Sequence, residues 1–183
     1  MFPVAHLIGP GGAGKSTIGA VLARRLNWRF VDLDQCFLSW HGHIGDLIDR
    51  HGYAGYARRN IQLYADLRHR VAEPMVCALS SGFMTYPSDI APAYPSIRSS
   101  IESDARTALL LPALDLEKCT SLIVARQLSR TYLKASAESE ARKIRDRFPR
   151  LMALNCARFV SEGPVDAIAA SIERFIRDSL ARA

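Results

Sequence analysis

Short apolar runs alternate along this chain with stretches in which apolar residues recur every three or four positions. The runs are typical of buried strands, and the periodic stretches are typical of helices that pack on a sheet. The runs predict strands at residues 4–8, 29–33, 75–79, 107–111 and 157–160. The periodic stretches predict helices at residues 15–26, 55–72, 116–130 and 135–147, with a last helix after Gly163-Pro164. This alternation predicts an α/β fold with a parallel sheet.

The segment 84–106 fits the alternation least well. Its three prolines, Pro87, Pro92 and Pro95, favour an excursion over the surface followed by a short helix. No change of composition marks a linker, and no internal repeat is evident. The 183 residues therefore have the size and continuity of one domain, residues 1–183.

Composition argues against several classes of protein. The sequence is 49% hydrophobic, enough for a sizeable core, yet no run of about 18 apolar residues predicts a membrane span. The first apolar run is too short for a signal peptide, so we expect a cytoplasmic protein with no membrane partner. The four cysteines are scattered without a CxxC pair, which favours small core residues over disulfides or metal ligands.

The net charge of +6 comes mainly from residues 126–150, with a smaller basic group at 58–70. No aromatic side chains are interleaved with these basic residues in a way that predicts a nucleic-acid surface, so no nucleic-acid partner is expected. Most of the positive charge is interpreted as solvated helix faces. One or two arginines at 142–150 are expected to contact phosphate, because arginine suits a transferring phosphoryl group.

A glycine-rich motif between the first strand and the first helix carries the strongest chemical signal. Residues 9–17 read GPGGAGKST and fit the phosphate-loop pattern GxxxxGK[ST]. Glycines let the backbone wrap an anion, and the following helix presents its positive end to phosphate. Lys15 is predicted to reach the β- and γ-phosphates of ATP, and Ser16 to bind Mg²⁺. The predicted nucleotide contacts of the loop are Gly11, Gly12, Ala13, Gly14, Lys15, Ser16 and Thr17.

Two carboxylates, Asp32 and Asp34, follow at the end of the second predicted strand. Ligands of open parallel sheets bind at the carboxyl ends of strands, and strand alternation would put both side chains on one side, with Leu33 turned away. One carboxylate can then contact Mg²⁺ and the other can accept the proton of an attacking hydroxyl. The alternative is that Asp34 serves as the N-cap of the next helix.

With these motifs in place, the chain resembles the shikimate kinase family of nucleoside-monophosphate-kinase-like P-loop enzymes. The resemblance rests on Gly9–Gly19 (GxxGxGKSTxG), on the DxD of Asp32 and Asp34, and on a segment at 45–60 similar to GExxFRxxE. It continues through Ser80-Ser81-Gly82, where the family has three glycines, then a basic lid, Arg147-Phe148-Pro149 and Gly163-Pro164.

The resemblance implies a three-layer fold with a five-stranded parallel sheet and a mobile lid at about 126–147. It implies transfer of the ATP γ-phosphate to a ring hydroxyl, with an acceptor-binding segment at about 34–60. Lys15, Asp34 and the lid residue Arg130 correspond to catalytic residues, and Ser16 and Asp32 to Mg²⁺ contacts. Arg126 and Pro164 correspond to residues that flank adenine. The predicted substrate contacts are Asp34, Arg58, Gly82 and Arg147.

The acceptor half departs from the family pattern. The arginine of FRxxE corresponds to Ala57, with Arg58 next in sequence, and the glutamate corresponds to Asn60. Shikimate is the first acceptor to test, and gluconate, a nucleotide or an antibiotic alcohol remain alternatives. A nucleotide-binding regulatory module without transferase activity is a further alternative. A monomer or weak dimer is expected.

Overall fold

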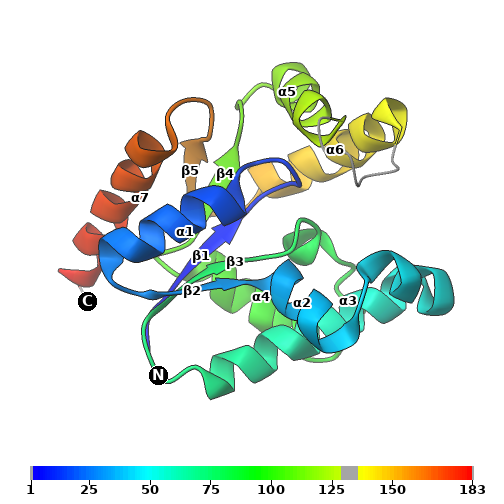
Figure 1. Ribbon diagram of the computed structural model, residues 1–183, viewed down its shortest axis with the longest axis horizontal. Coiled ribbons are helices and arrows are strands. Elements are labelled where there is room, and N and C mark those ends of the chain that lie inside the picture. The colour runs from blue at the N-terminus through cyan, green and yellow to red at the C-terminus, as the bar shows by residue number, and fades with distance from the viewer. Residues whose placement is uncertain (1, 129–135, 183) are drawn as a thin grey trace.

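The computed structural model describes residues 2–128 and 136–182. Five parallel strands form one sheet in the order β2-β3-β1-β4-β5. The strands are β1 (Val4–Ile8), β2 (Arg29–Asp32), β3 (Met75–Ala78), β4 (Ala108–Leu111) and β5 (Ala157–Val160). All five predicted strands are therefore present and parallel, which confirms the predicted fold class (Figure 1).

Helices cover both faces of the sheet and make the three predicted layers (Figure 1). The helices are α1 (Lys15–Leu26), α2 (Leu33–His41), α3 (Ile44–Arg70), η1 (Phe83–Thr85), α4 (Tyr94–Ser103), α5 (Leu116–Leu128), α6 (Ala137–Met152) and α7 (Val165–Leu180). Helices α1 and α7 pack against each other on one face, where they bury the side chains of Leu7 and Leu110. Among the described residues, no helix combines the length and apolar character needed to cross a membrane.

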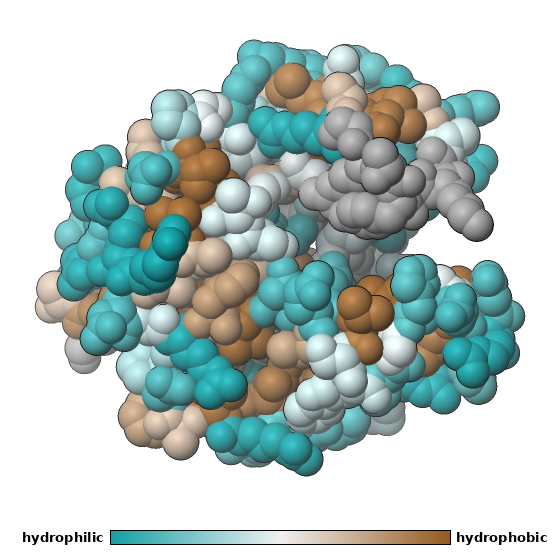
Figure 2. Space-filling view, in the orientation of Figure 1, coloured by the Kyte–Doolittle hydropathy of each residue, from teal (hydrophilic) through white to brown (hydrophobic). Residues whose placement is uncertain are grey.

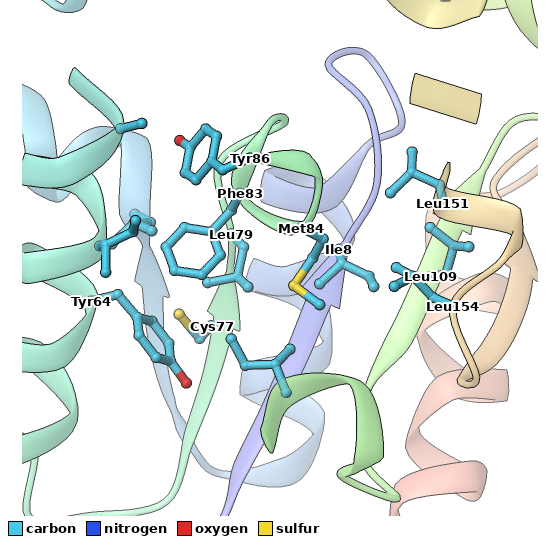
Figure 3. Packing of buried hydrophobic residues seen from close by; sticks show 14 of the residues in the cluster. Ile8, Tyr64, Cys77, Leu79, Phe83, Met84, Tyr86, Leu109, Leu151 and Leu154 are labelled. Atoms are coloured by element: carbon cyan, nitrogen blue, oxygen red, sulfur yellow. The ribbon is translucent and has the colours of Figure 1, made fainter. Parts of the chain in front are cut away.

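The opposite face of the sheet carries the larger part of the core. Residues that alternate with the first set, such as Ile8, Cys77 and Leu109, point to this side and pack against α3, η1, α4 and α6. Figure 3 shows Tyr64 of α3 and Phe83 of η1 lying on this layer close to Cys77 and Leu79. The unbroken apolar runs of the central strands follow from burial on both faces.

Two helix predictions need correction. The helix predicted at 55–72 begins earlier, at Ile44, and is interrupted by a kink at Gly52, whose φ of 69° suits glycine. The helix predicted at 135–147 is described from Ala137, with Ser136 as its N-cap, and runs through Pro149 to Met152 because Phe148 and Leu151 keep burying its inner face. The helix predicted at 116–130 is present as α5 from Leu116 to Leu128, and residues 129–130 lie outside the described residues.

The segment 84–106 behaves as its prolines predict. Residues after η1 cross the surface, and the short helix α4 starts at Tyr94 with Pro95 in its first turn. Proline is tolerated there because the first amides of a helix have no partner within it.

A buried histidine in the central strand makes stability depend on pH. His6 is 3% exposed and its Nε2 lies 2.8 Å from the Tyr64 hydroxyl. Burial lowers the pKa of His6 from 6.5 to about 4, although the charge of Asp104 opposes the shift. The unfolded chain therefore binds the proton more readily between these two pKa values, and stability falls as pH drops below 6.5.

We expect the free energy of unfolding to decrease by about 2 kcal/mol between pH 7.5 and pH 5 because of this one group. Measuring the free energy of unfolding in urea at pH 7.5 and at pH 5 checks this prediction. A His6→Phe variant should lose this part of the pH dependence. A variant with the same pH dependence as the wild type would show that His6 does not cause it.

Candidate active site

The phosphate loop joins β1 to α1 at the carboxyl edge of the sheet. Gly12 and Gly14 both have positive φ values, 80° and 86°, and Gly14 is the N-cap of α1. Backbone amides in such a loop can point toward a bound anion. The Lys15 ammonium donates to the carbonyl oxygens of Gly9 (2.8 Å) and Pro10 (2.9 Å), which keeps it over the loop.

Oxygen ligands suitable for Mg²⁺ flank this loop. Ser16 and Thr17 are exposed in the first turn of α1, and Asp32 lies at the end of β2. Among the described residues no three His, Cys, Asp or Glu side chains cluster to hold a metal. A hydroxyl and a carboxylate fit Mg²⁺ that arrives with nucleotide, since this ion keeps several waters and binds substrate phosphates.

The two aspartates do not share a strand face as predicted. Strand β2 ends at Asp32, whose Oδ1 accepts hydrogen bonds from the backbone amides of Asp34 (3.0 Å) and Gln35 (3.2 Å). Asp32 is thus the N-cap of α2. The alternative prediction, that Asp34 is the N-cap of this helix, is also wrong. Leu33 turns into the core and Asp34 lies in the first helical turn.

Asp34 is half-buried beside the loop that follows β3. The Ser80 hydroxyl donates to its Oδ1 at 2.5 Å, and the Tyr56 side chain of α3 also acts to lower the pKa of this carboxyl. Burial raises the pKa of the Asp34 carboxyl, while the hydrogen bond from Ser80 and the charge of Lys15 oppose the shift. A carboxylate with a raised pKa close to the phosphate-binding lysine is suited to accept a proton.

Arg147 of α6 reaches the same loop from the other side. Its Nη1 donates to Ser81 Oγ (3.3 Å) and its Nη2 donates to the Tyr53 hydroxyl (3.2 Å). A Cβ at Gly82 would clash with the Tyr53 hydroxyl and lie 3.3 Å from Arg147 Nη2, so a side chain at this position would displace the Tyr53 hydroxyl. The structure therefore brings together Asp34, Gly82 and Arg147, three of the four predicted substrate contacts.

Helix α3 has the neutral residues Ala57 and Asn60 at the two positions where the resemblance led us to look for charged side chains. Asn60 is fully buried, and its Nδ2 donates to the Tyr86 hydroxyl (2.9 Å) and approaches the Tyr56 hydroxyl (3.4 Å). Ala57 is also fully buried, so a longer side chain there would require its neighbours to move. Burial raises the pKa values of Tyr53, Tyr56 and Tyr86, which keeps their hydroxyls protonated at neutral pH.

From the sequence, Tyr53 and Tyr56 could line the acceptor site or pack against the core, with packing favoured, and the side chains of Ser80 and Ser81 were expected to narrow or alter the acceptor pocket. The rings of Tyr53 and Tyr56 do contact each other, with centroids 5.8 Å apart, but both hydroxyls face polar groups of the site. The spacing of three residues between the tyrosines places them on one helix face. This spacing in the sequence could have indicated that the two tyrosines lie side by side.

The other predicted residues lie around this centre. Arg126 donates to the carbonyls of Gly12 (3.2 Å) and Ser161 (3.2 Å), and so connects the phosphate loop with the loop that leads to Pro164, the N-cap of α7. Arg58 is exposed and its Nε donates to the Ile90 carbonyl (3.0 Å), and it lies about 100° around the axis of α3 from Ala57. Arg130 lies outside the described residues.

Figure 2 shows an indentation of the surface between the part formed by α5 and α6 and the part formed by α2 and α3. A second hollow, of about 570 Å³, lies at the opposite edge of the sheet beside Thr107, Asn155 and Ala157. It is remote from the phosphate loop because these residues precede or begin their strands.

Fold and loop together define a P-loop kinase fold of the nucleoside-monophosphate-kinase-like group. Residues 11–91 match the family described as Shikimate kinase, which is fewer than half of the residues of this chain. A shikimate kinase from Shewanella amazonensis is 46% identical over 65 residues, which cover 35% of this chain and 38% of that protein. The matches to curated relatives cover between 5% and 52% of the relatives' own lengths.

Solved structures agree with this fold over almost the whole chain. A shikimate kinase from Acinetobacter baumannii in complex with shikimate has a TM-score of 0.73 at 22% identity, covering 97% of this chain and 94% of that one. A gluconokinase from Sinorhizobium meliloti has a TM-score of 0.57 at 16% identity, covering 99% and 92%.

Proposed function

We propose that the protein is an ATP-dependent kinase of one domain that transfers the γ-phosphate to a hydroxyl of a small metabolite in the cytoplasm. The observation that carries the proposal is the position of Asp34. Its carboxylate accepts a hydrogen bond from the Ser80 hydroxyl, and the positive charge of Lys15 also acts to lower its pKa. Burial outweighs both effects, so the pKa of Asp34 is raised. A proton acceptor beside a phosphate-binding loop is the arrangement that phosphoryl transfer to an alcohol requires.

Each residue has a defined part in this reaction. Backbone amides of the loop and the Lys15 ammonium would hold the phosphates of ATP, and Ser16 and Asp32 would contact Mg²⁺, which offsets phosphate charge. The acceptor hydroxyl gives its proton to Asp34 while its oxygen bonds to the γ-phosphorus, and the bond from that phosphorus to the bridging oxygen of ADP breaks. Arg126 and Pro164 would flank adenine.

Shikimate is the first acceptor to test, because residues 11–91 match the shikimate kinase family and a structural neighbour was solved with shikimate. Arg147 supports an acidic acceptor, since its guanidinium faces the site at the end opposite to Asp34. Release of ADP from Mg²⁺-ATP should depend on shikimate or on a related small hydroxylated compound in a panel.

The control for this assay is Mg²⁺-ATP without acceptor, together with thermal unfolding in the presence of nucleotide. Binding of nucleotide raises the melting temperature by linkage. Nucleotide stabilisation without ADP release for any acceptor of the panel would favour the regulatory module over the kinase.

A further inference from the structure

Helix α5 carries a buried polar side chain, Gln127, that has no part in the contacts described so far. Gln127 is 8% exposed, and within the described residues its Oε1 is buried without a hydrogen-bond partner. A buried acceptor without a partner lowers stability, whereas methionine or leucine would fill the same space without this cost. The amide therefore needs an explanation other than packing.

The position of α5 brings Gln127 to the phosphate loop. Helix α5 follows β4, and β4 pairs with β1, so this helix begins at the same edge of the sheet as the loop that follows β1 (Figure 1). Arg126 and Gln127 are three and four positions after Ile123, so the three residues share one face of α5. Arg126 donates to the Gly12 carbonyl, and Ile123 Cγ2 and Gln127 Cγ lie 3.5 Å and 3.6 Å from the position that a Cβ on Gly12 would take.

The carboxamide of Gln127 lies against Gly11. A Cβ placed on Gly11 would be only 2.6 Å from Gln127 Nε2 and 3.7 Å from its Cδ. Gly12 and Gly14 have positive φ values but Gly11 does not, so the backbone at residue 11 does not itself require glycine. The side chain of Gln127 thus occupies the space that a side chain at residue 11 would fill, with its nitrogen closest to the loop.

One further distance shows which side of the phosphate loop the carboxamide is on. Ser81 Cβ lies 3.9 Å from the same Cβ position on Gly11, and the neighbouring Ser80 donates to Asp34. Gln127 is therefore on the side of the loop that faces the proposed proton acceptor. In transfer to a hydroxyl, the terminal phosphate of ATP lies between the rest of the nucleotide and the attacking oxygen. We therefore expect the terminal phosphate on the Gln127 side of the loop.

We propose that Gln127 is a further nucleotide contact, in which Nε2 donates a hydrogen bond to the terminal phosphate of ATP. The inference rests on the proposed function, because it names how the same site distinguishes ATP from ADP. Neutral N–H donors fixed beside a transferring phosphoryl group stabilise the charge on its oxygens. Oε1 is farther from Gly11 than Nε2 is, which keeps the oxygen, a group that would repel phosphate, away from the loop.

The test compares ADP with β,γ-imido-ATP, a non-hydrolysable analogue that adds the terminal phosphate, each titrated by calorimetry with Mg²⁺ into the whole chain. Gln127→Met keeps the length of the side chain and removes both polar atoms of the amide. It should weaken binding of the analogue about tenfold and leave ADP binding unchanged, because ADP has no terminal phosphate for Nε2 to contact. Its melting temperature without nucleotide should be no lower than that of wild type, since an unpaired buried oxygen is lost.

Gly11→Ala offers an independent route to the same contact, because its Cβ would displace the flexible end of Gln127. It should reduce the preference for the analogue over ADP as Gln127→Met does. In a Gln127→Ala background the same substitution should cause little further change, since the two residues act through one contact.

Gln62→Met is the matched control, because Gln62 is an exposed residue of α3 whose Nε2 donates to Asp66 (2.8 Å). It should leave both affinities at wild-type values. Equal weakening of analogue and ADP by Gln127→Met, or no weakening of either, would overturn the phosphate contact and leave the kinase proposal standing. Selective loss of the analogue without phosphate transfer to any acceptor would support the contact and overturn the kinase proposal. A wild type that binds neither nucleotide would overturn both.

Discussion

Replacing Lys15 by alanine is expected to reduce phosphotransfer by about 10²–10³-fold or more, the scale for loss of a preorganised charge at a reacting centre. The Lys15 ammonium lies over the phosphate loop, on the carbonyls of Gly9 and Pro10, and its side chain is not part of either core cluster. The variant should therefore keep the wild-type fold. Steady-state ADP release measures the loss, and circular dichroism checks the fold.

The matched control for this substitution is a second cation on the same helix, Arg24, which is exposed in the last turn of α1. Arg24→Ala removes a positive charge far from the loop and should leave turnover near the wild-type value. Full activity in Lys15→Ala would contradict the assignment of the loop.

Asp34→Asn is expected to lower kcat by roughly 10²–10⁴-fold, the usual contribution of a general base. Asparagine keeps the size of the side chain and can still accept from Ser80, but it cannot take the acceptor's proton. Affinity for ATP should change little. Single-turnover kinetics with a nucleotide-binding titration separate the two effects.

The raised pKa of Asp34 adds a pH signature. The base works only when ionised, so kcat/KM should fall as pH drops through a pKa above the ordinary carboxyl value of 3.8. Asp34→Asn should lose this acid limb. Near-normal turnover in that variant would exclude proton transfer to Asp34 and leave it as a structural residue of α2.

Strands β3 and β4 were predictable to within about one residue because burial on both faces leaves an unbroken apolar run, as at Met75–Ala78. The phosphate loop was predictable because its function depends on local backbone geometry between two adjacent elements. The first half of α3 was not predicted, since residues such as Asp46, Arg50 and His51 are largely exposed and leave little apolar periodicity.

The acceptor half was predictable only in part. Arg147 and Tyr53 are 94 positions apart in the sequence, so no local pattern could place the guanidinium on that hydroxyl. We predicted Asp32 and Asp34 on the same face of a strand, because the alternation of side chains along a strand does not show at which residue the strand ends. The hydrogen bond that the Asp34 amide donates to the Asp32 carboxylate makes Asp32 the N-cap of α2, so the strand ends at Asp32.

The order of strands has a consequence for redesign of specificity. Because β3 lies between β1 and β2, the turn Ser80-Ser81-Gly82 lies between Asp34 and Arg147. Ser80 donates to Asp34, and Ser81 accepts from Arg147. Three consecutive residues thus connect the aspartate that we propose as proton acceptor with the guanidinium of α6. Replacing this tripeptide alone would therefore change the surroundings of both Asp34 and Arg147. An attempt to introduce another acceptor specificity would have to replace Tyr53 and Arg147 together with the tripeptide.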